Sequence, residues 1–202
     1  MIKRIISFFF IFLFLLSASI YAINEEEELP PIWTQNQIIY HEIAEHARSM
    51  GLPEDNKIIQ LCKQLWWEEQ ENLNILAKTI AKEAGICPWL HRIAVGQVVM
   101  NRVASPDFPN TVKEVVGQKH EWYDSDGIFH RIYQYHPSYC SDFEGIDRQF
   151  YEDAKFVLDG NAVNTYIPDD IIWQAEFPQG TETWWISEIN YQNFHSTTYF
   201  CR

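Results

Sequence analysis

The stretch LAKTIAKEAG carries one carboxylate, Glu83, beside a stripe of apolar residues. On a helical wheel Glu83 lies at the edge of this stripe near Leu76 and Ile80, whereas Lys78 and Lys82 point well away from it. A carboxyl group in such a place loses hydration and gains no cation from its own helix, so its pKa should rise toward neutrality. A raised pKa is what a general acid needs. The wheel alone favours a boundary glutamate that reaches solvent, so the role of an acid needs further support.

A second group that could carry chemistry is the pair of histidines in HEIAEH, His41 and His46. Zinc-binding histidines in a metalloprotease helix are four residues apart, roughly 40° around the helix, whereas a spacing of five places them roughly 140° apart. We therefore predict an amphipathic helix here, and a protein with neither a metal nor an organic cofactor. A metal site among the histidines near the aromatic segments stays open as an alternative: His120, His130, His136 and His195.

The four cysteines are Cys62, Cys87, Cys140 and Cys201. Cys87 follows the end of a predicted helix, where the helix dipole disfavours the thiolate that a nucleophile requires, so a structural cysteine is the better interpretation. An even number of cysteines allows one or two disulfides with three possible pairings, and free buried thiols are the alternative. No CxxC occurs, which argues against a zinc cluster of cysteines.

The N-terminal segment, residues 1–32, precedes the predicted helices and strands that carry the glutamate, histidines and cysteines described above. Residues 1–22 have a basic start, an apolar run and a small residue at Ala22, which predicts a signal peptide, with a retained anchor as the alternative. Residues 23–32 contain four glutamates and two prolines and are typical of an acidic linker. No later stretch is apolar enough to span a bilayer. We therefore expect a secreted or wall-associated protein without a stable membrane span after cleavage.

Hydrophobic periodicity in the rest of the chain predicts an α+β protein dominated by helix. Residues 33–70 form a helical extension of two helices, and residues 71–202 form the region that holds Glu83. A third helix is expected from Glu71 to Gly85, and the next, LHRIAVGQVVMNRV, is apolar almost all round and should be central to the core. The remaining expectations are a capping box at Thr111 and Glu114, loops over residues 119–145, a helix over 146–158, and two or three short strands after residue 170.

Composition limits the possible partners. The chain has 202 residues, of which 47% are hydrophobic and 15% aromatic, so it can bury a sizeable core. Its formal net charge is -13, and removal of Lys3 and Arg4 with the leader would make it -15. Such a charge repels phosphate backbones and anionic lipids, which argues against nucleic acid or a membrane surface as partner.

The strings AKTIAKEAG and IAVGQVVMNRVASPDFPNTVKEVV resemble the catalytic domain of spore cortex-lytic enzymes and related bacterial and phage cell wall hydrolases. In that family a helix carries Ala-Glu-Ala, Asn-Arg-Val begins eighteen residues after the glutamate, and Ser-Pro-x-Phe-Pro-Asn-Thr follows. Asn101 lies eighteen residues after Glu83, and NRVASPDFPNT completes the pattern without a gap.

This resemblance implies that residues 71–202 form a cell wall hydrolase catalytic domain with a lysozyme-like fold related to lytic transglycosylases. It implies Glu83 as the catalytic acid and the glycan strands of peptidoglycan as partner. It gives Asn101–Val103 and Ser105–Thr111 packing duties. A transglycosylase needs no second protein carboxylate, because the N-acetyl group or 6-hydroxyl of the sugar can act instead. The rival hypothesis is a non-catalytic wall-binding or spore-coat protein on the same scaffold, and a zinc or thiol peptidase is a poorer third. We expect a monomer.

Other residues are assigned less directly. Glu121, Asp124 and Asp126 are candidates for a second acid, but they read as solvated loop residues. The aromatic residues of the type that stacks on sugar rings are Trp122, Tyr123, Tyr133, Tyr166 and Trp173. The chain departs from the family pattern at Cys87, at His91 and Arg92, and at Thr198, positions that bear on substrate recognition in the resemblance.

Overall fold

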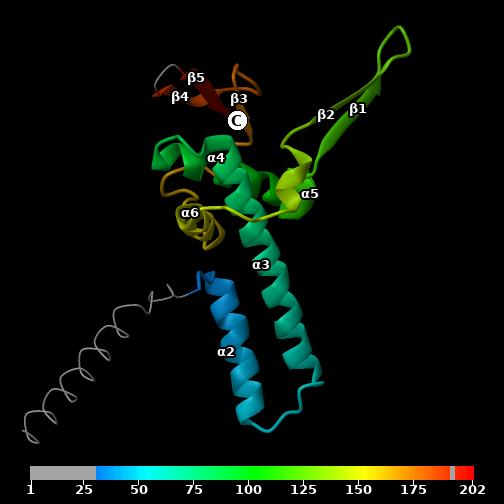
Figure 1. Ribbon diagram of the computed structural model, residues 1–202, viewed down its shortest axis with the longest axis vertical. Helices are drawn as coiled ribbons and strands as arrows, with labels where there is room; N and C mark the ends of the chain where they lie inside the picture. The colour runs from blue at the N-terminus through cyan, green and yellow to red at the C-terminus, as the bar shows by residue number, and fades with distance from the viewer. Residues whose placement is uncertain (1–30, 192–193) are drawn as a thin grey trace, which may run out of the picture. The chain divides into compact units, whose positions relative to one another are not determined.

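The computed structural model describes residues 31–191 and 194–202, so the predicted signal peptide and nearly all of the acidic linker lie outside the described residues (Figure 1). The described helices are α2 (Gln35–Ser49), α3 (Lys57–Ala84), α4 (Trp89–Ala104), α5 (Val112–Val116) and α6 (Arg148–Leu158), with a short 3-10 helix η1 (Pro137–Cys140). The described strands are β1 (Lys119–Tyr123), β2 (Phe129–Tyr133), β3 (Trp173–Ala175), β4 (Thr183–Tyr191) and β5 (Phe194–Cys201). The prediction of a mainly helical α+β protein is confirmed. No helix in these ranges has the length and apolar character needed to cross a membrane.

Helix α3 is one continuous helix of 28 residues, and the expectation of two helices meeting near Glu71 is wrong. No glycine or proline lies between Lys57 and Ala84, so nothing in the local sequence ends the helix there. The expected junction between the extension and the Glu83 region, at residues 70 and 71, therefore falls inside α3.

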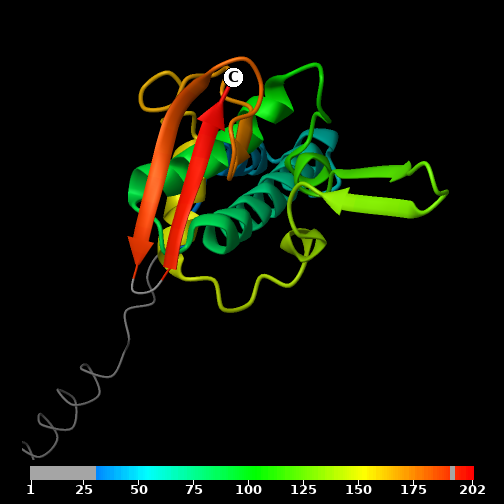
Figure 2. The ribbon, with the colours of Figure 1, turned by 90° about the horizontal axis from the view of Figure 1, so that it is seen from above.

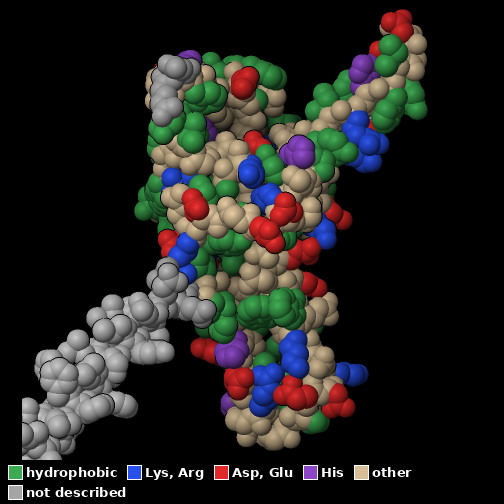
Figure 3. Space-filling view, viewed as in Figure 1, with side chains coloured by type: hydrophobic (Ala, Val, Ile, Leu, Met, Phe, Trp, Pro, Cys, Tyr) green, Lys and Arg blue, Asp and Glu red, His purple; other side chains and the backbone are tan. Residues whose placement is uncertain are grey.

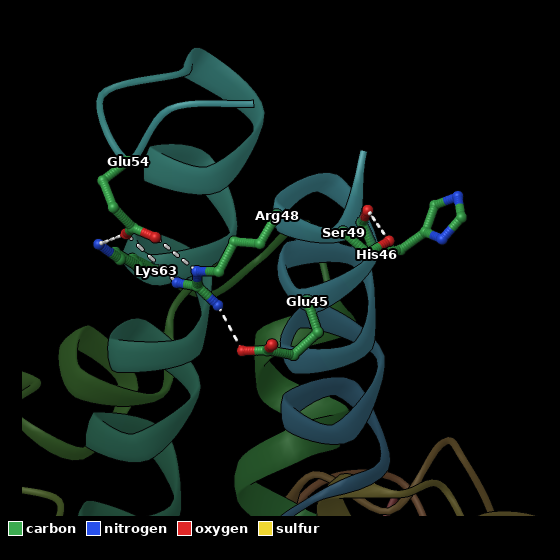
Figure 4. Close-up of polar contacts among 6 residues, drawn as sticks. All are labelled: Glu45, His46, Arg48, Ser49, Glu54 and Lys63. Carbon is green, nitrogen blue, oxygen red and sulfur yellow. Dashed lines mark hydrogen bonds and ion pairs between the residues drawn. The ribbon is translucent and has the colours of Figure 1, made fainter. Parts of the chain in front are cut away.

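Helices α2 and α3 form an antiparallel hairpin that buried polar groups tie together at one end (Figure 1). Thr34 caps α2 in a capping box with Gln37, and its hydroxyl donates to the Glu69 carboxylate at 2.9 Å. At the other end Arg48 bridges Glu45 and Glu54, each at 2.6 Å, and Lys63 also contacts Glu54 at 2.8 Å (Figure 4). The two clusters fix the alignment of the helices.

The main core lies among the second half of α3, α4, α5 and α6. Helix α4 buries ten of its sixteen residues, which confirms the prediction that it is central. At Gly96 a Cβ atom would lie 3.0 Å from Ile80 and 3.2 Å from Val157, so this glycine lets α3, α4 and α6 approach closely. Helix α6 ends before Gly160, whose φ of 75° favours glycine.

The C-terminal residues form an antiparallel sheet in the order β3-β5-β4, which confirms the expected strands (Figure 2). The turn at Pro178–Gly180 joins β3 to β4. Gly180 has a φ of 65°, and a Cβ atom there would lie 1.8 Å from the Arg202 carbonyl oxygen. Only glycine therefore fits where the end of the chain passes this turn.

Residues 119–133 form a hairpin of β1 and β2, so the expectation of loops throughout residues 119–145 is wrong. Figures 1 and 2 both show this hairpin extending away from the helices. Glu121 pairs with Arg131 and Tyr123 with Phe129 across the strands. Because the hairpin has no face against the core, aromatic and charged residues occur on both faces, and the apolar alternation that would reveal strands is missing.

Candidate active site

Glu83 lies in a cleft of about 310 Å³ between the last turn of α3 and the C-terminal sheet. The loop after α3 and the first turn of α4 complete one wall, and β4 and β5 provide the other. The lining residues are Ala81, Lys82, Glu83, Gly85, Ile86, Cys87, His91, Ile189, Phe194, Ser196 and Thr198. Glu83 is the single carboxylate among these described lining residues.

The environment of Glu83 favours its protonated form. Part of the Glu83 residue is exposed to solvent, but neighbouring groups desolvate its carboxyl group and raise the pKa of that group. A hydrogen bond with Tyr139 acts in the opposite direction and stabilises the carboxylate. Glu83 also lies in the last turn of α3, where the negative end of the helix dipole disfavours a carboxylate. The direction of the shift is the one expected from the apolar stripe.

Two tyrosines interact with Glu83, Tyr139 by a hydrogen bond and Tyr135 electrostatically, and no pattern in the sequence indicates either. Tyr139 lies on η1 and hydrogen-bonds Glu83, while burial and the Glu83 carboxylate raise the pKa of its phenol. Tyr135 is fully buried, and its pKa rises to about 12 through burial, with Arg102 opposing the shift and Glu83 adding to it. Both belong to the segment expected to be loop, and only its folding brings them to Glu83.

Lys78 holds the segment that carries Tyr139. On the helical wheel Lys78 points away from the apolar stripe, yet the residue is only 5% exposed. Its ammonium group donates to the backbone carbonyls of Ser141 and Asp142, just after η1. Lys82, by contrast, is exposed as expected. Carbonyl oxygens from a neighbouring segment satisfy the buried ammonium, which a wheel of one helix cannot show.

Asn101 and Arg102 make the packing contacts expected of the Asn-Arg-Val motif. Asn101 donates to the carbonyl oxygens of Pro168 and Ile171 at 2.9 and 2.8 Å, and Arg102 Nε donates to the Ile172 carbonyl at 2.7 Å. The Arg102 guanidinium lies 5.2 to 5.8 Å from the ring centres of three aromatic residues: Phe108, Tyr135 and Trp173. Trp173, predicted to bind substrate, is therefore part of this cage.

The other predicted substrate-binding residues also lie outside the lining of the Glu83 cleft. Trp122 and Tyr123 are on β1, where Trp122 stacks against both His120 and His130. Tyr166 packs against Trp89 and Phe156. Tyr133 lies on β2. A role for these aromatics in glycan binding stays a prediction.

The candidates for a second acid are on the same hairpin and its turn. Hydrogen bonds from Lys119 and Arg131 lower the pKa of Glu121, and a hydrogen bond from His130 lowers that of Asp124. Both groups are held as carboxylates. Neither they nor Asp126 line the cleft.

The positions at which the chain departs from the family pattern gather around Glu83. Cys87, His91 and Thr198 line the cleft. Burial raises the pKa of Cys87, against the needs of a nucleophile, and lowers the pKa of His91 to about 4, so the imidazole is neutral. Arg92 pairs with Asp153 at 2.6 Å and donates to the Cys87 carbonyl at 3.1 Å. All four cysteines are free thiols in the structure.

The site is a cleft between a helix end and a sheet, and its described lining includes one carboxyl group of raised pKa. A hydrolase that uses a general acid needs a cleft for its substrate and a group of this kind. The family described as cell wall hydrolase matches residues 89–200, more than half of the chain. The protein belongs to this family and is a cell wall hydrolase by class. Among curated proteins and solved structures, no match to the chain was found. The matched range begins six residues after Glu83.

Proposed function

We propose that the protein is a secreted enzyme that cleaves the glycan strands of peptidoglycan, of the lytic transglycosylase or muramidase type, with Glu83 as the general acid. The observation that carries this proposal is the position of Glu83 in the cleft, where it is the one carboxyl group among the described lining residues and has a raised pKa. The family supports the wall as substrate, and the predicted signal peptide supports export.

In this reaction the Glu83 carboxyl group donates its proton to the oxygen that bridges two amino sugars, and the bond from that oxygen to the anomeric carbon breaks. The carbon then carries positive charge, which the N-acetyl oxygen or the 6-hydroxyl of the same sugar relieves by bonding to it. The oxygen that completes the reaction, from the 6-hydroxyl or from water, gives its proton to the Glu83 carboxylate, which restores the acid. Tyr139 donates to the Glu83 carboxylate once the proton has left. Glycosidases with two carboxyl groups place them roughly 5 to 9.5 Å apart, whereas the described lining supplies one. This difference favours a transglycosylase over a two-acid hydrolase.

Replacement of the acid tests the proposal directly. Glu83→Gln keeps the shape of the side chain and removes its proton, so release of soluble fragments from purified peptidoglycan should fall by roughly 10²–10⁴-fold. Glu121→Gln is the control, because Glu121 is held as a carboxylate on the hairpin, and it should lose much less. Mass spectrometry of the parent's products separates anhydro-sugars from reducing ends.

A folded Glu83→Gln protein that digests peptidoglycan at the parent rate would place the acid elsewhere. The wall-binding hypothesis makes a different prediction. Under it the parent releases no fragments at all, and Glu83→Gln binds peptidoglycan as well as the parent does.

A further inference from the structure

A second cavity, of about 270 Å³, lies in the hairpin of α2 and α3, outside the range that the family matches. Its walls come from Tyr40 and His41 on α2, Trp66 and Trp67 on α3, and Trp33 just before α2. We call this cavity the aromatic pocket. Trp67 and Glu83 are sixteen residues apart on α3, or about 24 Å along the helix axis. The aromatic pocket is therefore separate from the Glu83 cleft.

The tryptophans of the aromatic pocket present ring faces and edges in different directions. The ring centres of Trp33 and Trp66 are 5.9 Å apart at 84°, and those of Trp66 and Trp67 are 4.9 Å apart at 85°. Trp67 remains 67% exposed, although an indole is among the most favourable side chains to bury. Within the described chain no hydrogen bond uses the indole N–H of any of the three. Flat apolar faces with free donors beside them suit a ligand that has both apolar and polar sides.

Two cations also line the aromatic pocket, although the chain as a whole is strongly acidic. Arg48 and Lys63 are held in place by Glu45 and Glu54 (Figure 4). Figure 3 shows Lys or Arg side chains and Asp or Glu side chains gathered toward the end of the hairpin. The Lys63 ammonium has three N–H groups and contacts one carboxylate. The cavity therefore combines stacking surfaces with fixed, charged hydrogen-bond donors.

We propose that the aromatic pocket is a second carbohydrate-binding site and holds one N-acetylated amino sugar of a peptidoglycan strand. The C–H face of the sugar ring would stack on the indoles, and Arg48 and Lys63 would donate to its hydroxyl, acetamido or attached carboxylate oxygens. The volume of about 270 Å³ lies just below the usual range for ligand pockets, roughly 300–1,000 Å³, which suits a ligand as small as one sugar unit. The choice of this glycan as ligand rests on the proposed function.

Binding by the full-length Glu83→Gln protein separates this site from catalysis. We would measure co-sedimentation with insoluble peptidoglycan and tryptophan fluorescence during titration with an N-acetylglucosamine oligomer. Trp67→Ala in this background should weaken both by about tenfold, as expected for the loss of one stacking surface worth roughly 1.4 kcal/mol. Leu61→Ala is the matched control, because Leu61 is 54% exposed on the same helix but does not line the pocket, and it should bind unchanged.

Each outcome decides the proposal. Equal binding by the Trp67→Ala protein and its parent overturns it, and so does an equal loss in the Leu61→Ala control, which would indicate general apolar adhesion. Self-association that Trp67→Ala abolishes, without any response to the oligomer, would assign the pocket to a second copy of the chain. If the Glu83→Gln protein still hydrolyses peptidoglycan, Glu83 is not the general acid and the proposed function fails. The comparison of binding by the Trp67→Ala and Leu61→Ala variants still decides whether the aromatic pocket binds sugar.

Discussion

The two cavities on α3 differ in how they are built. The Glu83 cleft joins residues that are more than a hundred positions apart, such as Glu83 and Thr198. The aromatic pocket draws all its lining residues from positions 33–67, within a single helical hairpin. The cleft carries an acid of raised pKa, whereas the carboxylates beside the pocket are neutralised by Arg48 and Lys63. One helix thus contributes to two cavities, one with a carboxyl group of raised pKa and one with aromatic rings and ion-paired cations.

Removing Asp153 should damage the cleft far more than the aromatic pocket. The Arg92–Asp153 pair is largely buried, with 14% and 6% of the side chains exposed, and Arg92 also holds the Cys87 carbonyl at the cleft. Asp153→Ala leaves a buried guanidinium without its partner, which should lower the free energy of unfolding by about 3–5 kcal/mol in urea titrations. Glu152→Ala, which removes an exposed pair with Arg148, should change it by about 0.5 kcal/mol or less. An equal decrease in the free energy of unfolding for Asp153→Ala and Glu152→Ala would show that the buried Arg92–Asp153 pair does not stabilise the fold more than the exposed pair.

Tyr139→Phe should retune the acid without removing it. The Tyr139 hydrogen bond lowers the pKa of Glu83, so its loss should raise that pKa further. A general acid works only while protonated, and the alkaline limb of the pH–rate profile should therefore move to higher pH. The rate at the optimum should change by roughly fivefold, for a bond worth about 1 kcal/mol. Tyr151→Phe is the control, since burial alone raises the pKa of Tyr151, and an identical pH profile for both variants would contradict a link to Glu83.

The smallest effect is expected at Glu54, beside the aromatic pocket. Hydrogen bonds from Arg48 and then Lys63 lower its pKa to about 2. Stability from a depressed carboxyl pKa is present above the unfolded value and disappears as the pH falls through the folded value. The unfolding midpoint of Glu54→Gln should thus lie slightly below that of the parent at neutral pH, and the gap should close toward pH 2. A gap that persists at pH 2 would argue against the ion pairs as its cause.

Sequence reasoning was most accurate where a single element determines the outcome. The apolar character of α4 and the end of α6 at Gly160 are local properties, and the structure confirms them. The expected capping box is present in part: Thr111 caps α5 by accepting from the Glu114 backbone N–H, but the Glu114 carboxylate accepts from the Thr111 hydroxyl instead of from its backbone N–H. The edge position and raised pKa of Glu83 also follow from one helix.

The remainder of the site depends on contacts that no local pattern contains. Tyr139 reaches Glu83 because Lys78 binds carbonyl groups more than sixty residues away. The aromatic residues that the sequence predicts for sugar binding do not include Trp66 and Trp67, because no local pattern shows that the hairpin brings them together with Trp33 in one pocket. The predicted start of a new helix near Glu71 is wrong, because without a glycine or proline the helix propensity of these residues continues α3 through this point.

The unbroken course of α3 has a kinetic consequence if both cavities hold the same polymer. Kinks in helices usually form at glycine or proline, and α3 contains neither. The distance between the aromatic pocket and Glu83 is therefore nearly constant. Once the aromatic pocket holds a glycan strand, binding of the same strand in the Glu83 cleft is intramolecular. Its rate then depends on an effective concentration and no longer on diffusion from solution. A stiff spacer also restricts which bonds are within reach. The first products from an intact strand should therefore show a preferred length, set by α3.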